Sequence, residues 1–152
     1  MGFKLGMEAK LYFSATLLDG ETNTPDALSW TEQTNVKDLT LNLETGEADV
    51  TTRANSGWRA TAATLKEGSI EFEMVWDTGD GGFTAIKNAW LNSTELALAA
   101  MDGDIDTAGN QGLASNFTVT NFSRSEPLEE AMTVSVTIKP SSFTEWYEVA
   151  GA

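Results

Sequence analysis

The chain has 152 residues, no cysteine, no histidine, and a formal net charge of −14 from 23 acidic and 9 basic residues. Without cysteine or histidine, disulfides, thiolate nucleophiles and imidazole bases are excluded. The acidic balance argues against ordinary binding to phosphate or anionic lipid. The N-terminus has no apolar run long enough for a signal peptide or a membrane span, which predicts a protein made and used without export.

The first third of the chain predicts two strands separated by a long excursion. Residues 8–18 form the first predicted strand, and 21–33 form a polar loop that either binds a partner or packs its Trp30 back on the body. Residues 36–44 alternate strictly, with three leucines on one face and polar side chains on the other. Thr45 and Gly46 then predict a turn.

The segment 45–66 carries three of the nine basic residues, at Arg53, Arg59 and Lys66. A partly basic projection on a very acidic body is a candidate for contacting an acidic copy of the same protein. The alternative is a solvated hairpin without a partner.

The middle of the chain predicts a core strand, the one good helix and a buried strand. In residues 69–77, large apolar side chains alternate with Glu71 and Glu73, which predicts one core-facing and one polar face. A flexible turn leads into a helix over 83–91, whose apolar stripe consists of Phe83, Ile86 and Trp90. Residues 95–101 are short, apolar and bounded by turns, so we expect a strand buried on both faces.

Two alternating segments near the C-terminus predict a pair of strands. Residues 117–120 and 132–138 are joined by a charged turn over 123–130, and Pro140 is expected to end the second strand. The tail 141–152 carries Trp146 and Tyr147, which either pack on their own domain or reach a neighbouring subunit.

Three sequence patterns hint at chemistry, and each is incomplete. Asp77-Thr-Gly resembles an aspartic protease motif, but the mechanism needs two such carboxylates, and Asp80 adds a third charge nearby. Residues 102–106 have the alternating acids of a calcium loop but lack its glycine and final glutamate. Trp30, Trp58 and Trp146 are the tryptophans left free for a sugar-binding platform.

Several segments, in their order and spacing, resemble the phage major tail (tail tube) protein family. They are residues 6–12, the run from Glu47 to Ala60, residues 65–79, and the C-terminal strand pair that ends at Pro140. The resemblance covers most of the chain and contains no catalytic fingerprint. It implies a mainly β subunit, a β-sandwich or barrel-like fold with one flanking α-helix, that forms rings and has no enzyme activity.

The resemblance further implies a single domain over 1–152 whose copies form stacked, hexameric rings around an acidic channel for DNA. The inter-subunit loop is expected at 45–66 and a second contact in the tail 141–152. Contact candidates are Arg53, Trp58, Arg59, Lys66, Trp146 and Tyr147, and the lumen candidates are Glu71 and Glu73.

The implied partners are further copies of the chain, other tail proteins such as the tape measure, terminator and sheath, and DNA that passes without specific binding. No cofactor, metal or membrane is implied, and the protein is expected in the virion tail after synthesis in the host bacterial cytoplasm. Two alternatives stay open: a monomeric β-sandwich module that binds carbohydrate or protein, and a tube subunit of a secretion or bacteriocin machine.

Overall fold

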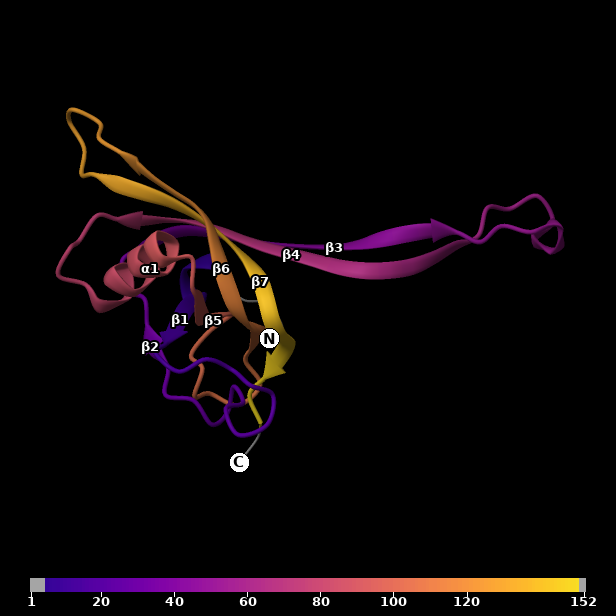
Figure 1. The fold of residues 1–152 in the computed structure, drawn as a ribbon, viewed down its shortest axis with the longest axis horizontal. Coiled ribbons are helices and arrows are strands. Elements are labelled where there is room, and N and C mark those ends of the chain that lie inside the picture. Colours follow the sequence, from indigo (N-terminus) through magenta and orange to yellow (C-terminus); the bar gives the residue numbers. More distant parts are fainter. Residues whose placement is uncertain (1–4, 151–152) are drawn as a thin grey trace.

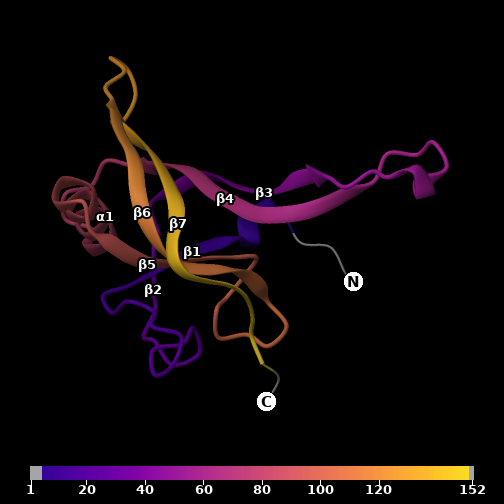
Figure 2. The same ribbon diagram turned by 45° about the vertical axis from the view of Figure 1, so that its right-hand side comes forward.

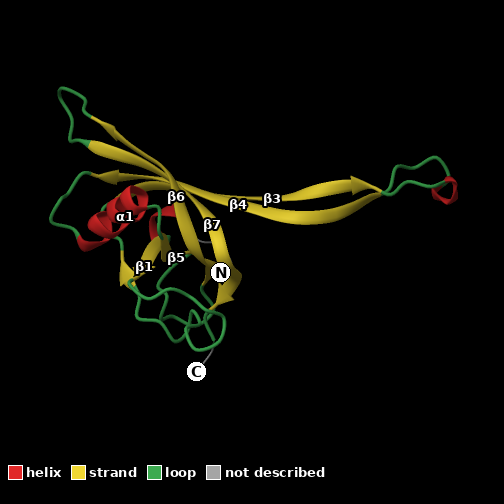
Figure 3. Cartoon of the chain, in the orientation of Figure 1, coloured by secondary structure: helices red, strands yellow, loops and turns green. Residues whose placement is uncertain are grey.

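The computed structural model describes residues 5–150, which form a β-rich body with one long projecting hairpin (Figure 1). The described elements, in chain order, are η1 (Gly6–Glu8), β1 (Lys10–Ser14), β2 (Thr31–Glu32), β3 (Val36–Asp49), η2 (Arg53–Asn55), β4 (Thr61–Val75), α1 (Gly81–Asn92), β5 (Glu95–Met101), β6 (Gln111–Ser125) and β7 (Thr133–Glu148). The predicted mainly β class with one flanking α-helix is confirmed (Figure 3).

The strands form one seven-stranded sheet in the order β2-β1-β5-β6-β7-β4-β3. Every neighbouring pair in this order is antiparallel. The sheet bends strongly between β5 and β7, so that its two ends run in different directions (Figure 2). α1 packs against β6 and β5 and covers part of the concave side.

The core lies on both faces of β5, as the short apolar run 95–101 predicts. Leu96, Leu98 and Ala100 join the larger cluster with α1, β4, β6 and β7. Ala97, Ala99 and Met101 point the other way, into a smaller cluster with Tyr12, Leu18 and Ile105. Since both faces are covered, β5 is held from both sides and forms the centre of the body.

α1 begins and ends where its sequence supplies caps. The Asp80 side chain accepts a hydrogen bond from the Phe83 backbone N–H at 2.8 Å, and Ser93 ends the helix in the left-handed conformation. Phe83, Ile86 and Ala89 are its buried apolar side chains, together with Gly82. The predicted burial of Trp90 is wrong: Ala89 takes the inward position, and Trp90 is 44% exposed, with its ring stacked on Phe122.

Two predicted strand ends are wrong, and in each case the strand continues through an irregularity. β3 does not turn at Thr45-Gly46, because Gly46 lies in a register shift between the pairs Thr45–Lys66 and Glu47–Ala63. β7 does not end at Pro140. β4 pairs with β7 only as far as Ile138, so the missing N–H of Pro140 costs no bond to β4, and β7 continues along β6 to Glu148.

A buried asparagine fastens the long N-terminal excursion to the sheet. Asn116 is 1% exposed; its Oδ1 accepts from the Leu18 N–H at 2.8 Å, and its Nδ2 donates to the Leu18 carbonyl at 2.8 Å. Trp30 lies further along the excursion, donates to the Pro25 carbonyl at 2.7 Å, and packs on the smaller cluster. Trp30 therefore packs back on the body, which was one of the two predicted alternatives.

Candidate assembly surfaces

Four strand segments form a sheet with one buried and one polar face: β3, β4, β7 and the β6 segment 119–125. On the buried face, Phe72 pairs with Leu39 on one side and Val136 on the other. On the opposite face, Glu71 pairs with Thr40 and Thr137. The alternation follows from the period of two along each strand. The polar face is continuous across all four strands.

Glu71 and Glu73 both lie on this polar face. Glu73 is paired with Lys37 at 3.8 Å, whereas the cross-strand neighbours of Glu71 are threonines. Glu44 and Glu67 stand directly opposite each other farther along the same face, and Lys139 is on it as well. These four glutamates face two lysines, so the polar face is acidic.

The two outer edges of this four-stranded sheet are open in the described part of the chain. β3 is the last strand of the sheet and pairs only with β4. β6 pairs with β5 only up to Thr118, so residues 119–125 have a neighbour on one side alone. Unpaired strand edges are ready to pair with another chain.

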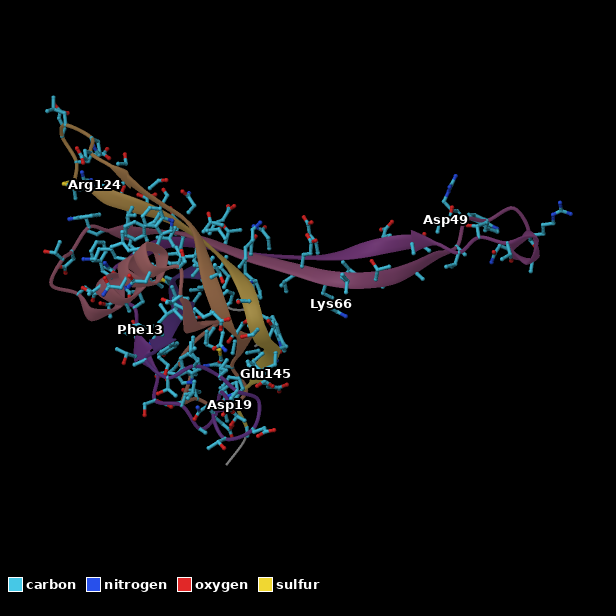
Figure 4. All side chains as sticks on the ribbon, viewed as in Figure 1. Phe13, Asp19, Asp49, Lys66, Arg124 and Glu145 are labelled. Carbon is cyan, nitrogen blue, oxygen red and sulfur yellow. The ribbon has the colours of Figure 1, made fainter. Side chains whose placement is uncertain are left out.

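β3 and β4 together form the projecting hairpin, which we call the arm (residues 43–66). Its shape follows from the pairing of Leu43 with Gly68 through to Asp49 with Thr61, a long two-stranded ladder that leaves the body (Figures 1 and 4). Leu43 is 54% exposed and Leu65 is 82% exposed. The arm therefore has no apolar cluster of its own.

The end of the arm, which we call the arm tip (residues 50–60), is a small ordered structure. Thr51 and Ala60 hold its base, since the Ala60 N–H donates to the Thr51 hydroxyl at 2.8 Å. Asp49 accepts from the Thr51 N–H at 2.9 Å and pairs with Arg59 at 3.6 Å. Hydrogen bonds from the Thr51 side chain and backbone lower the pKa of Asp49.

Trp58 is 79% exposed at the arm tip and forms one wall of a hollow of about 280 Å³. Arg53 is exposed in η2, and among the described residues it has no ion pair. Three of the six predicted contact residues, Arg53, Trp58 and Arg59, are thus brought together on one projecting surface. Their role as contacts stays a prediction.

Lys66 lies apart from the arm tip, where the arm leaves the body (Figure 4). It lines an open groove of about 1030 Å³ between β4 and the end of β7. Trp146 lines the same groove, is 52% exposed, and donates from Nε1 to Gln111 at 3.0 Å. Tyr147 points to the other side, packs against the smaller cluster, and has a pKa raised by burial.

One surface feature was missed by the sequence reading: the turn between β6 and β7, which we call the β6–β7 tip (residues 126–131). Leu128 is 100% exposed there. Arg124, which precedes the tip, lies 5.0 Å from the Trp76 ring centroid and pairs with Glu126. A leucine inside a charged turn is the signal that could have identified this surface.

The motifs that suggested chemistry do not gain support. Asp77 caps its own turn, accepting from the Gly79 N–H at 3.0 Å. Within residues 5–150, no group of three or more acidic side chains is placed to hold a metal ion. Trp58 lies on the arm tip and Trp146 on β7 of the body, so the tryptophans do not form one platform. No helix in the described residues has the length and hydropathy to cross a membrane.

The geometry thus defines a β-rich body with two open strand edges and a projecting arm. A family model described as phage tail tube protein matches residues 11–142. The chain belongs to this phage tail tube protein family, which is a family of structural proteins and not of enzymes.

Solved structures with the same fold come from a gene transfer agent virion, the SPP1 tail tube and an anti-feeding prophage baseplate. A chain of the virion of a native gene transfer agent particle aligns with a TM-score of 0.71 at 11% identity, over 95% of this chain and 99% of that chain. A chain of the SPP1 tail tube aligns with a TM-score of 0.69 at 16% identity, over 98% of this chain and 81% of that chain. A chain of the anti-feeding prophage baseplate aligns with a TM-score of 0.56 at 7% identity, over 93% of this chain and 91% of that chain. No curated protein sequence matches the chain.

Proposed function

We propose that copies of this chain join edge to edge into closed rings, and that the rings stack into a hollow tail tube. The observation that carries the proposal is the four-stranded sheet with an acidic face and two open edges. Strand directions alternate across it, so β3 and β6 run antiparallel to each other. The β3 edge of one copy therefore meets the β6 edge of the next in antiparallel orientation.

Ring closure removes both open edges and the aggregation hazard that they carry. The contact joins two different surfaces, and such head-to-tail contacts close into rings when the rotation allows. A gene transfer agent tail with this fold was computed with C6 symmetry. Six copies with four strands each would give an inner barrel of 6 × 4 = 24 strands.

The polar face of the sheet would then line the channel, with Glu71 and Glu73 as lumen residues. An acidic wall repels phosphate, so DNA passes along the channel without specific binding. The same charge opposes stacking, since six copies carry 6 × −14 = −84 formal charges. Stacking therefore depends on salt, on apolar burial, and on the basic residues of the arm.

The inter-subunit contacts fall in two parts of the single domain 1–152. One is the segment 45–66, with Arg53, Trp58, Arg59 and Lys66. The other is the C-terminal segment 141–152, with Trp146 and Tyr147. Exposed apolar side chains at Trp58 and Trp146 support this assignment, because burial against a second copy would remove them from water.

The assembled tube belongs in the virion tail, with synthesis in the host bacterial cytoplasm before assembly. Tape measure, terminator and sheath proteins are the further partners proposed from the family. The shared fold with an anti-feeding prophage baseplate chain keeps a related injection machine as the second candidate for the particle.

Negative-stain electron microscopy of the purified protein across a salt series tests the proposal. Rings or hollow tubes of constant diameter are expected, with longer tubes at higher salt because screening weakens the repulsion between rings. A dispersed monomer at every salt and protein concentration would contradict the proposal. The charge-reversed pair Arg53→Glu with Arg59→Glu should form rings but stack poorly. Unchanged stacking of that variant would show that the arm takes no part in the contact between rings.

A further inference from the structure

The arm tip is a basic surface with a hollow at its centre. Residues 50–60 contain Arg53 and Arg59 and no acidic residue. The hollow of about 280 Å³ is lined by the exposed Trp58, by Arg59 and by Thr51 and Thr52, among others. Its volume is sufficient for one aliphatic side chain.

The β6–β7 tip has the opposite character. Residues 126–131 contain three glutamates and no basic residue. Leu128 is 100% exposed between Pro127 and Glu129, so it stands out from the turn as an apolar knob. Among the described residues Glu129 and Glu130 have no ion pair.

The two tips lie at opposite ends of the same sheet. β6 and β7 carry the β6–β7 tip away from the body on one side, and β3 and β4 carry the arm tip away on the other (Figure 1). One copy therefore cannot join its own two tips. Copies stacked in the same orientation bring the arm tip of one toward the β6–β7 tip of the next.

We propose that the β6–β7 tip of one copy docks in the arm tip of a copy in the adjacent ring. Leu128 enters the hollow beside Trp58, while Glu129 and Glu130 face Arg53 and Arg59. The contact unites the most exposed leucine of the described chain with its most exposed tryptophan and pairs charges of opposite sign. This inference rests on the proposed tube, and names the surface that receives the arm.

The groove beneath the arm is the competing receiver for the β6–β7 tip. It is lined by Lys66 and Lys139 and by apolar side chains that include Trp146. It is also lined by Glu44, Glu67 and Glu145, so its acids outnumber its lysines. An acidic tip is repelled there, whereas the hollow at the arm tip is lined by one acid and one base, Asp49 and Arg59, and Arg53 adds a positive charge from η2.

Cysteine cross-linking tests the contact directly, because the chain contains no cysteine of its own. Thr52→Cys with Glu129→Cys places one thiol in the hollow and one beside Leu128. Tubes of this variant, treated with a short bis-maleimide, should give a ladder of oligomers on a denaturing gel. The matched pair Lys139→Cys with Glu129→Cys should give none. The proposal is overturned if only the Lys139 pair gives a ladder. It is also overturned if neither pair gives a ladder although both variants form tubes.

A charge swap decides the question independently of cysteine chemistry. Arg53→Glu and Glu129→Arg should each reduce the fraction of protein in tubes about tenfold or more, because each places like charges together. The double variant should recover most of that loss, whereas Lys87→Glu with Glu129→Arg should not. The proposed contact is overturned if the fraction of protein in tubes recovers equally in both double variants, or if it recovers in neither of them. Absence of tubes from the unmodified chain would instead contradict the proposed function.

Discussion

The strands β3 and β4 run through both the body and the arm, and they meet opposite conditions in the two regions. Within the body, β4 buries Ile70, Phe72 and Met74 to 4% exposure or less. A few residues earlier on the same strand, Leu65 is 82% exposed, and its neighbour strand leaves Leu43 54% exposed. Both parts have a continuous backbone ladder, so the difference lies in what covers the side chains.

This difference separates what stabilises the monomer from what serves assembly. A two-stranded ribbon without a packed face is only marginally stable in water. The body has two apolar clusters around β5, whereas the arm has its ladder and a few hydrogen bonds at the tip. Substitutions in the body should therefore change the free energy of unfolding, and substitutions in the arm should change tube formation.

The largest effect on stability is expected at Phe83. It is 1% exposed on α1, and its ring meets the Trp76 ring edge-on with centroids 4.8 Å apart. Phe83→Ala should lower the free energy of unfolding by about 3–5 kcal/mol, through lost burial and the cavity that remains. Chemical denaturation of the monomer measures this. Leu128→Ala, at a fully exposed site, is the control and should change it by less than about 0.5 kcal/mol. Equal effects at the two sites would refute the division between body and tips.

The next effect is expected at Asn116, where the body depends on polar contacts. Asn116→Ala leaves the Leu18 N–H and carbonyl without their partner in a buried place. Each unsatisfied group costs about 1–3 kcal/mol, so a loss of roughly 2–4 kcal/mol is expected. Asn121→Ala on the exposed polar face is the matched control, with a loss under about 0.5 kcal/mol. Denaturant titration of both variants gives the comparison, and a loss at Asn116 no larger than the control would exclude a fastening role.

Strands with one covered face could be predicted from the sequence, because their periodicity records that face. Residues 36–44 and 69–77 were predicted as strands from this alternation, and β3 and β4 confirm them. Residues 95–101 were predicted instead from their apolar run and flanking turns, and β5 confirms that strand. The arm could not be predicted in this way. Neither of its faces is covered by its own chain, so the alternation fades after Leu43, and Gly46 suggested a turn where the ladder contains a register shift.

The same reasoning explains the misplaced side chains. Trp90 fits the apolar stripe of a helix, but the sequence does not say where the neighbouring sheet ends, and Ala89 is the residue that reaches it. Pro140 suggested a strand end because proline lacks the backbone N–H that a strand between two neighbours needs. From Pro140 on, however, β7 pairs only with β6. The lone Leu128 was visible in the sequence, whereas its full exposure was not.

A shortened arm sharpens the comparison further. Asp49 and Thr61 are paired, so replacing residues 50–60 by Asn-Gly closes the ladder with a two-residue turn. The body should keep its free energy of unfolding within about 0.5 kcal/mol, while stacked tubes are lost. Sedimentation and electron microscopy measure assembly, and denaturation measures the body. Lys87→Ala, a change on α1, is the control that should retain tubes. Normal tubes from the shortened chain would show that the arm tip is dispensable.

The smallest effect is a pH response confined to the arm tip. The Thr51 side chain and N–H lower the pKa of Asp49 in the folded chain. A carboxylate whose pKa is lowered in the folded state stabilises that state at every pH above its unfolded pKa of about 3.9. This stabilisation of the arm tip is lost as the pH falls through the folded-state pKa. An NMR titration of the Thr51 amide should therefore show a midpoint below about 3.9.

Asp49→Asn should abolish that step, because the amide does not titrate, and the β5 amides of the unmodified chain should stay unchanged over the same pH range. The reference amides are those of residues 97–100, where β5 is covered on both faces, because the acidic residue of β5, Glu95, lies at the exposed start of the strand. A midpoint at or above the ordinary value for aspartate would mean that the Thr51 hydrogen bonds do not persist in solution. A simultaneous shift of the β5 amides would mean that arm and body respond as one unit, against the separation that their burial indicates.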